Sequence, residues 1–216
     1  MKLYLFRHGQ TDWNKVHRFQ GRIDIPLNDF GRELARVTAQ RWPIVPYDRV
    51  YCSPLNRAQE TAQLILEGRP ELQNIITDER IIEFAFGENE GKNIDVAGND
   101  PNNAMYNLLH HPECYVPAPG AESFDDLVAR ARGFLTDVIL PLEQQGLKNI
   151  LVVAHGALIR GLVCAAGLKE IRNFWDCPYH NCCLTTLDIT DGKITLEREA
   201  EVFYDSEGLF GGWTKK

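Results

Sequence analysis

The sequence predicts an α/β fold, a three-layer sandwich in which helices flank a mostly parallel central sheet. Short strand-like runs alternate along the chain with segments of helical period, the pattern of parallel α/β proteins. The run from Asn149 to Ala154 is almost purely aliphatic, as expected of a parallel strand covered on both faces. With 216 residues, the chain has the length of one enzyme-sized domain, so we expect a single domain over residues 1–216.

The first third of the chain contains two predicted strands and two predicted helices. Apolar strand formers fill 2–6 and 49–52, and residues 29–42 have the spacing of an amphipathic helix. Ser53 is predicted as the N-cap of a second helix, which begins with Pro54 and extends to about residue 67.

The rest of the chain continues the alternation. A capping box of Ser123 and Asp126 predicts a long helix that continues toward Gln145. The other expected elements are extended pieces or a short strand over 74–77 and 80–82, a helix over 156–166, and strands over 183–189 and 194–197 around a turn at 191–192.

Residues 84–121 hold most of the irregular sequence, and we expect them to form a lid-like insertion. His110 and His111 lie in this polar segment and follow no strand end or glycine turn, so we expect both to be solvated. Aromatic side chains near this region either line a pocket or belong to the core, where most aromatic residues lie. They are Trp13, Phe84, Phe86, Tyr106 and Tyr115.

Composition excludes several classes of function. The formal net charge is -7, whereas general nucleic-acid binders and membrane-surface proteins need a cationic face. No apolar run is long enough for a signal peptide or a membrane span, so we expect a cytoplasmic protein. The six cysteines include no C-x-x-C pair, and we expect no disulfide framework, no metal site and no cofactor.

Candidate site residues follow three of the predicted strands directly. Arg7 and His8 follow the first strand, Arg57 lies just after the second, and His155 and Gly156 follow the aliphatic one. The carboxyl ends of parallel strands meet at one edge of a sheet, which is where ligands of open α/β sheets bind. Two arginines and two histidines at that edge would form a local cationic pocket suited to a small phosphorylated substrate.

Each of these residues also has an ordinary structural explanation. A histidine after a strand is commonly a hydrogen-bonded loop residue, and Arg57 in a first helical turn is commonly solvated. Their joint occurrence at three equivalent strand ends favours a site. Gly9 and Gly156 would allow the backbone to approach a ligand closely.

These residues and their neighbours resemble the histidine phosphatase superfamily, which contains the cofactor-dependent phosphoglycerate mutases and many small-molecule phosphatases. The resemblance covers nearly the whole chain and implies a phosphoglycerate mutase-like fold. It rests on residues 5–11 with 13–14, 20–21 with 24, 26 and 27, 53–55 with 57–58 and 61–62, 83 with 87, 90 and 91, 119–120 with 122–123, and 153–156.

The resemblance also implies roles for individual residues. His8 would carry the phosphoryl group, and Glu83 would be the acid and base. The groups that would hold the phosphoryl oxygens are Arg7, Asn14, Gln20, Arg57, His155 and the backbone at Gly156.

The chemistry of these residue types agrees with the implied roles. A neutral imidazole is a good nucleophile and forms a labile N–P bond, so one difficult displacement becomes two easier ones. Arg7, Arg57 and a protonated His155 would stabilise the charge that a metal ion stabilises in kinases. Glu83 would protonate the leaving alkoxide and then activate water, although without the family pattern it would be interpreted as a surface carboxylate.

Two features favour the phosphatase branch of the superfamily over the mutase branch. Mutases tend to carry arginine where Phe84 follows Glu83, and the only Lys or Arg from 81 to 129 is Lys92. Gln20 before Gly21 also resembles the phosphatases. We therefore expect a phosphatase that hydrolyses a small phosphorylated metabolite through a phosphohistidine intermediate.

Two alternatives remain open at this stage. One is a cofactor-dependent phosphoglycerate mutase, and the other is a non-catalytic relative that binds a phosphorylated ligand. The intact set of Arg7, His8, Arg57, Glu83 and His155 argues against the non-catalytic alternative. Asn89 stands where many relatives have Trp, so the leaving group stays open among the sugar phosphates, phosphoglycerates and nucleotide-precursor phosphates that the family implies.

Overall fold

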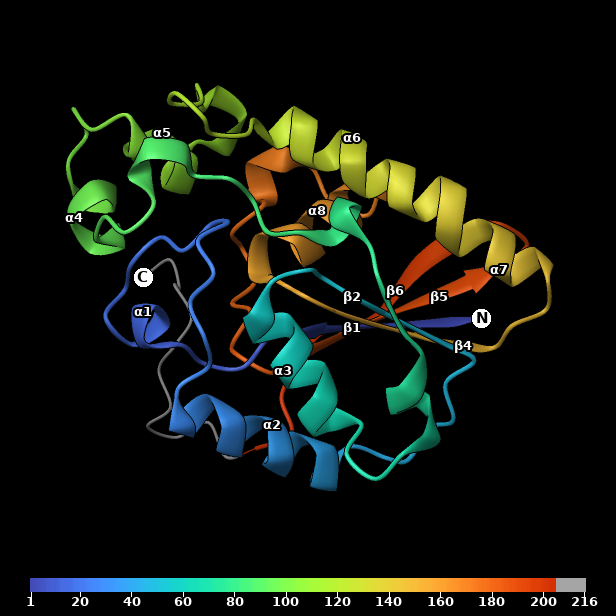
Figure 1. Ribbon diagram of the computed structural model, residues 1–216. Helices are drawn as coiled ribbons and strands as arrows, with labels where there is room; N and C mark the ends of the chain where they lie inside the picture. The colour runs from blue at the N-terminus through green and yellow to red at the C-terminus, as the bar shows by residue number, and fades with distance from the viewer. Residues whose placement is uncertain (205–216) are drawn as a thin grey trace.

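A six-stranded mixed sheet forms the centre of the molecule in the computed structural model, which describes residues 1–204 (Figure 1). The strand order is β3-β2-β4-β1-β5-β6, in which the first four strands are parallel and β5 is antiparallel to both of its neighbours, β1 and β6. The strands are β1 (Lys2–Arg7), β2 (Arg49–Cys52), β3 (Ile75–Thr77), β4 (Asn149–Ala154), β5 (Leu184–Thr190) and β6 (Lys193–Glu201). The predicted α/β sandwich is confirmed.

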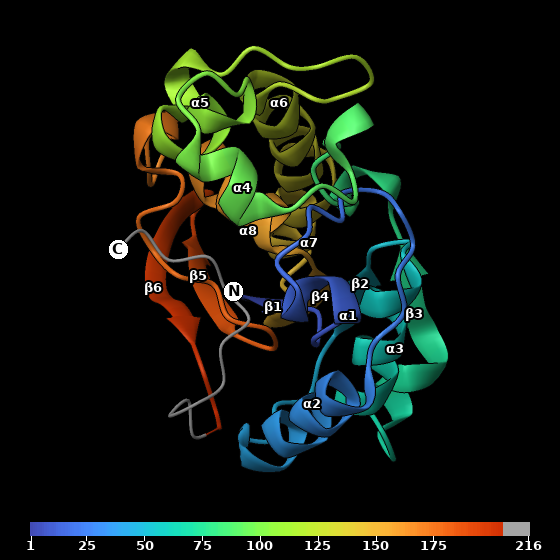
Figure 2. The same ribbon diagram turned by 90° about the vertical axis from the view of Figure 1, so that its left-hand side faces the viewer.

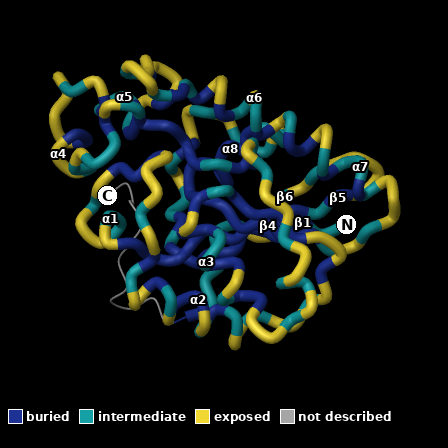
Figure 3. The backbone as a smooth tube through the Cα atoms, viewed as in Figure 1, coloured by how far each residue is buried: buried dark blue, intermediate teal, exposed yellow. Residues whose placement is uncertain are grey.

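The strand β4 lies at the centre of the parallel part, between β1 and β2. Its residues from Ile150 to Ala154 are all buried, and the inner strands form a continuous buried path in Figure 3. Ile150 and Val152 belong to the core on one face of the sheet, while Leu151 and Val153 belong to the core on the other. The aliphatic run therefore reflects two apolar layers rather than one.

Helices cover both faces of the sheet (Figures 1 and 2). The helices α2 (Asp29–Arg41) and α3 (Asn56–Ile65) cover one face, and α8 (Gly156–Ala165) and α6 (Phe124–Phe134) cover the other. The predicted capping box starts α6, and a π-helical segment, Leu135–Ile139, joins α6 to α7 (Leu140–Gln144). The long helix expected toward Gln145 is thus present, with a wider turn inside it.

Two local predictions were wrong. The helix α3 begins at Asn56 rather than at Pro54, and Leu55 occupies its N-cap without a capping side chain. Ser53 is instead engaged with the buried His155, so its hydroxyl is committed to the site rather than to the helix. Residues 79–81 form a 3-10 turn, because the carboxylate of Asp78 accepts a hydrogen bond from the backbone N–H of Arg80 (2.9 Å).

The predicted insertion contains short helices. They are α4 (Ile94–Asn99) and α5 (Met105–His110), with 3-10 turns at Gly87–Asn89 and Pro112–Cys114. Together with α1 (Asp12–Lys15), α4 and α5 lie on the side of the molecule where the parallel strands end (Figures 1 and 2). A lid function for this segment stays a prediction.

The two histidines of this segment differ. His111 is exposed, as predicted, but His110 is half-buried, with its Nε2 2.8 Å from the carbonyl oxygen of Gly98 and its ring stacked on Tyr106. No helix within residues 1–204 has the length and apolar character needed to cross a bilayer. All six cysteines are free thiols.

Candidate active site

The carboxyl ends of β1, β2 and β4 lie in register and bring the predicted site residues together. The N–H of His8 donates to the carbonyl of Ala154 (3.0 Å), and the N–H of Ser53 donates to that of Val153 (3.0 Å). One cavity is lined by seven of the eight predicted residues: Arg7, His8, Asn14, Gln20, Arg57, Glu83 and Gly156. The eighth, His155, is buried beside His8, with 5.2 Å between the ring centroids.

His8 is held in the state that a nucleophile needs. Its Nδ1 lies 2.6 Å from the carbonyl oxygen of Gly9, and a carbonyl can only accept, so Nδ1 carries the proton and Nε2 keeps its lone pair. Burial, then the guanidinium groups of Arg57 and Arg7, lower the pKa of His8 well below its ordinary 6.5. The imidazole is therefore neutral at neutral pH.

Arg57 is a fully buried guanidinium fixed by backbone carbonyls. Its Nη1 donates to Ile23 O (2.9 Å) and its Nη2 to Gly21 O (2.7 Å), while Nε has no partner among the described residues. Burial lowers the pKa of Arg57 to about 10, so the group is still charged at neutral pH. The carboxylate of Glu90 fixes the loop that supplies these carbonyls, accepting from the N–H groups of Arg22 (3.0 Å) and Ile23 (3.1 Å).

Two glycines allow this close packing. Gly21 has a φ of +55°, and a Cβ there would lie 2.0 Å from a carboxylate oxygen of Glu90. A Cβ on Gly156 would lie 3.3 Å from Nε of Arg7 and 3.3 Å from Nη1 of Arg160. Glycine at these positions lets charged groups approach the backbone.

Two amides present donors toward the phosphoryl site. The Oδ1 of Asn14 accepts from Thr11 N (3.1 Å), which leaves its NH₂ group for the cavity. Gln20 is oriented the same way, because its Oε1 accepts from Thr11 Oγ1 (2.8 Å). Both amides therefore suit an anionic ligand.

His155 is held by Ser53 on one side of its ring. Its Nε2 lies 2.6 Å from Ser53 Oγ, and its buried Nδ1 has no partner among the described residues. Burial is the largest of the influences that lower the pKa of His155 well below 6.5, followed by Arg57 and His8. These influences favour a neutral His155, and a bound phosphate dianion would favour the protonated form that its predicted role needs.

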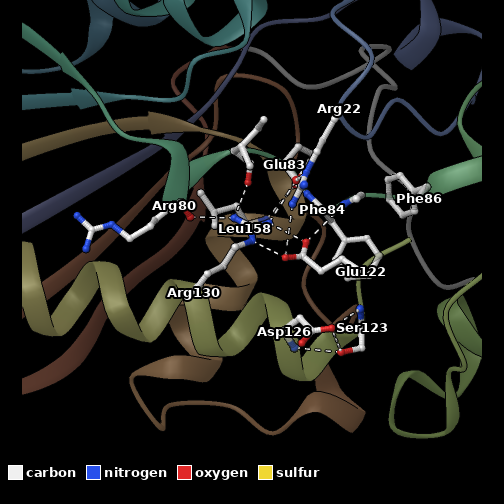
Figure 4. Close-up of polar contacts among 12 residues, drawn as sticks. Arg22, Arg80, Glu83, Phe84, Phe86, Glu122, Ser123, Asp126, Arg130 and Leu158 are labelled. Atoms are coloured by element: carbon white, nitrogen blue, oxygen red, sulfur yellow. Dashed lines mark hydrogen bonds and ion pairs between the residues drawn. The ribbon is translucent and has the colours of Figure 1, made fainter. Parts of the chain in front are cut away.

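Glu83 lies at the N-terminus of α8 (Figure 4). Its carboxylate accepts from the backbone N–H groups of Phe84 (2.9 Å), Leu158 (3.1 Å) and Ala157 (3.4 Å). The side chain is buried yet lines the cavity, so it can exchange a proton with a group bound there.

A buried ion pair supports the backbone of Glu83 (Figure 4). Arg130 of α6 forms two hydrogen bonds with the carboxylate of Glu122 (2.5 and 2.9 Å). The same guanidinium donates to the carbonyls of Arg80 (2.8 Å), Ile82 (2.7 Å) and Glu83 (3.2 Å). One side chain thus fixes three carbonyls of the segment that ends at Glu83.

Comparison with known proteins assigns the family. The model of the histidine phosphatase superfamily (branch 1) matches residues 3–201. The chain belongs to the histidine phosphatase superfamily. The roles of the individual residues at the three strand ends stay predictions.

Three relatives illustrate the range of the superfamily. The protein named "Putative phosphoserine phosphatase 2" of Hydrogenobacter thermophilus is 33% identical over 90% of this chain and 93% of its own length. A 2,3-bisphosphoglycerate-dependent phosphoglycerate mutase of a Methylobacterium species is 38% identical over 74% of this chain and 78% of its own. The solved structure of Bacillus stearothermophilus YhfR is 31% identical, with a TM-score of 0.81 over 93% of this chain and 97% of that one.

The cavity of this superfamily member has two parts. We call the part formed by Arg7, His8, Asn14, Gln20, Arg57 and Gly156 the phosphoryl half. We call the part formed by Arg18, Phe19, Phe86, Leu109, Arg160 and Trp175 the leaving-group half. Phe86 is the only one of the five aromatic residues singled out in the sequence that lines the cavity; Phe84 and Tyr115 belong to the core.

Sequence reasoning missed two buried polar residues. Asn181 precedes β5, and its Nδ2 donates to the carbonyls of His8 (3.1 Å) and Gly9 (3.1 Å), which fixes the loop after β1. Arg160 of α8 lies in a helix that otherwise buries apolar residues, so an arginine there was a signal that went unused. Among residues 1–204, no three His, Cys, Asp or Glu side chains are grouped so as to hold a metal ion.

Proposed function

We propose that this protein is a phosphatase that hydrolyses small phosphate monoesters through a phosphohistidine on His8. The observation that carries the proposal is the state of His8: a neutral, buried imidazole whose Nδ1 is engaged by Gly9 and whose free Nε2 lies among Arg7 and Arg57. A nucleophile and its anion-binding partners thus share one cavity. Phosphatase names among the relatives agree with this chemistry.

The reaction would proceed in two displacements. In the first, the lone pair of Nε2 attacks phosphorus, the P–O ester bond breaks, and Glu83 gives its proton to the departing alkoxide. In the second, Glu83 takes a proton from water while the water oxygen attacks phosphorus, and the N–P bond breaks to return neutral His8 and inorganic phosphate. Arg7, Arg57 and the amides of Asn14 and Gln20 would stabilise the equatorial oxygens throughout.

We also propose that catalysis requires no metal ion, because two guanidinium groups supply the positive charge at the phosphoryl group. EDTA should leave turnover intact, and vanadate should inhibit because it can adopt the five-coordinate geometry of the transferring group. Loss of activity in EDTA with rescue by magnesium or zinc would contradict the proposal. A cytoplasmic location stays a prediction from the sequence.

The covalent intermediate provides the direct test. Brief incubation with ³²P-labelled substrate and an alkaline quench should trap an acid-labile phosphoprotein. The label should be absent from His8→Ala, and label that persists in this variant would assign the nucleophile elsewhere.

The main competing function is that of a phosphoglycerate mutase, since mutases are among the relatives. A mutase must keep water from its phosphohistidine and return the phosphoryl group to a second hydroxyl. Parallel assays of phosphate release and of phosphoglycerate interconversion separate the two functions. We expect phosphate release to dominate, and efficient interconversion with little release would establish the mutase.

A further inference from the structure

The leaving-group half of the cavity contains a buried cation whose role the proposed reaction does not explain. Arg160 projects from α8 and is 7% exposed. Its Nη1 donates to Gly156 O (2.9 Å) and its Nη2 to Cys177 O (2.8 Å). Each of these nitrogens has a second hydrogen, and Nε has no partner among the described residues.

Arg160 forms no ion pair with an acidic side chain of residues 1–204. The guanidinium lies over the ring of Tyr179 (4.2 Å to the centroid) and near that of Trp175 (5.0 Å). Burial, the largest influence, and the nearby charge of Arg7 lower the pKa of Arg160. Two carbonyls and two rings offset only part of the cost of burying a charge, which an anionic partner would offset further.

The charges around the cavity are also unbalanced. Its lining includes four arginines, Arg7, Arg18, Arg57 and Arg160, but only one carboxylate, Glu83. With its histidines neutral and Glu83 protonated as the general acid, the lining carries a formal charge of about +4, so a phosphate monoester dianion leaves an excess of positive charge. A second negative group on the substrate would reduce this excess.

We propose that Arg160 binds a carboxylate on the alcohol part of the substrate, so the preferred substrates are short phosphorylated hydroxy acids. The distance favours a short molecule, because one methyl group on Gly156 would contact both Arg160 and Arg7. A carboxylate a few bonds from the ester oxygen can therefore reach Arg160 while its phosphate lies at Arg7. This proposal rests on the proposed phosphatase function and names its substrate class.

A matched pair of substrates tests the assignment. 3-Phosphoglycerate and glycerol 3-phosphate differ in a carboxylate that is replaced by a hydroxymethyl group. The wild-type kcat/KM for phosphate release should favour 3-phosphoglycerate by about 10- to 100-fold, the effect of a charge-assisted hydrogen bond. A ratio near one in the wild type would overturn the proposal.

Variants then assign the ratio to one residue. Arg160→Gln should reduce it to within about threefold of one, and Arg160→Lys should retain part of it because the charge stays. Arg18→Gln removes the other arginine of the leaving-group half and should change the ratio less than threefold. If Arg18→Gln abolishes the preference and Arg160→Gln preserves it, the carboxylate is bound at Arg18 and the assignment is wrong.

A binding measurement separates this proposal from the phosphatase function. His8→Ala cannot form the covalent intermediate, so calorimetry on it reports the affinity for both ligands without turnover. 3-Phosphoglycerate should bind about 10- to 100-fold more tightly than glycerol 3-phosphate, and the preference should disappear in His8→Ala/Arg160→Gln. Absence of phosphate release by the wild type would refute the phosphatase function alone, whereas equal affinities would refute the role of Arg160.

Discussion

The two halves of the cavity are built in different ways. The phosphoryl half follows the ends of β1, β2 and β4, and backbone carbonyls hold its nucleophile and its buried cation: Gly9 O for His8, and Gly21 O and Ile23 O for Arg57. The leaving-group half takes Phe86 and Leu109 from the segment of short helices and Trp175 from a loop after α8. The phosphoryl half thus depends on the sheet, whereas the leaving-group half combines Arg160 of α8 with side chains from segments outside the sheet.

Removing one histidine from the phosphoryl half and one from the insertion should give the largest difference in activity. His8→Ala removes the nucleophile, and we expect turnover to fall by roughly 10⁴-fold or more. His111→Ala, in the exposed part of the insertion, should change kcat/KM less than about twofold, as is usual for surface substitutions. Steady-state kinetics with one alkyl phosphate is sufficient, and a large loss in His111→Ala would place a catalytic group in the insertion.

The phosphoryl half could be predicted from the sequence better than the leaving-group half. The strand ends were predictable because aliphatic runs locate the inner strands, and a parallel sheet brings their carboxyl ends to one edge. The role of Ser53 was not, because a serine before proline has the local pattern of an N-cap, and only the distant His155 shows that its hydroxyl is needed elsewhere.

The leaving-group half was less predictable for a related reason. Arg160 follows His155 by five residues, but its place in the cavity depends on Tyr179 and Trp175, which approach from a separate segment.

Glu83 lines the cavity as the proposed general acid, so the effect of its loss should depend on the leaving group. In single-turnover experiments, Glu83→Gln should slow phosphorylation by alkyl phosphates by roughly 10²- to 10⁴-fold, the usual effect of a general acid. The leaving group of p-nitrophenyl phosphate is a stable phenolate that needs no proton, so the rate of phosphorylation by this substrate should fall much less. Glu88→Gln, an exposed neighbour, is the control. Equal losses for both substrate types would show that Glu83 is not the acid.

Substitution of Arg130 should also harm alkyl phosphates more than aryl phosphates, but less strongly, because Arg130 contacts the backbone of Glu83 rather than the substrate. Arg130→Lys cannot keep both the paired contact with Glu122 and the donors to three carbonyls. We expect a loss of about 10- to 100-fold for alkyl phosphates, a smaller loss for p-nitrophenyl phosphate, and about 1–3 kcal/mol lower stability. Arg132→Lys on the exposed side of α6 is the control, and equal losses for both substrates would indicate a structural role only.

The pH dependence of stability should also distinguish the two regions. His8 and His155 are fully buried with pKa values well below 6.5 in the folded protein, whereas the unfolded chain takes up protons near pH 6.5. Below that pH the unfolded state binds more protons, so the free energy of unfolding decreases as the pH falls toward the folded pKa values. The slope approaches about 1.4 kcal/mol per pH unit for each histidine.

Urea unfolding at pH 7.5 and 5.5, in phosphate-free buffer, should therefore show a smaller acid-induced loss of stability for His8→Asn/His155→Asn than for the wild type. His111→Asn should keep the wild-type loss because this side chain is exposed in the folded protein. An unchanged loss in the double variant would mean that the buried pair is not the source of acid sensitivity.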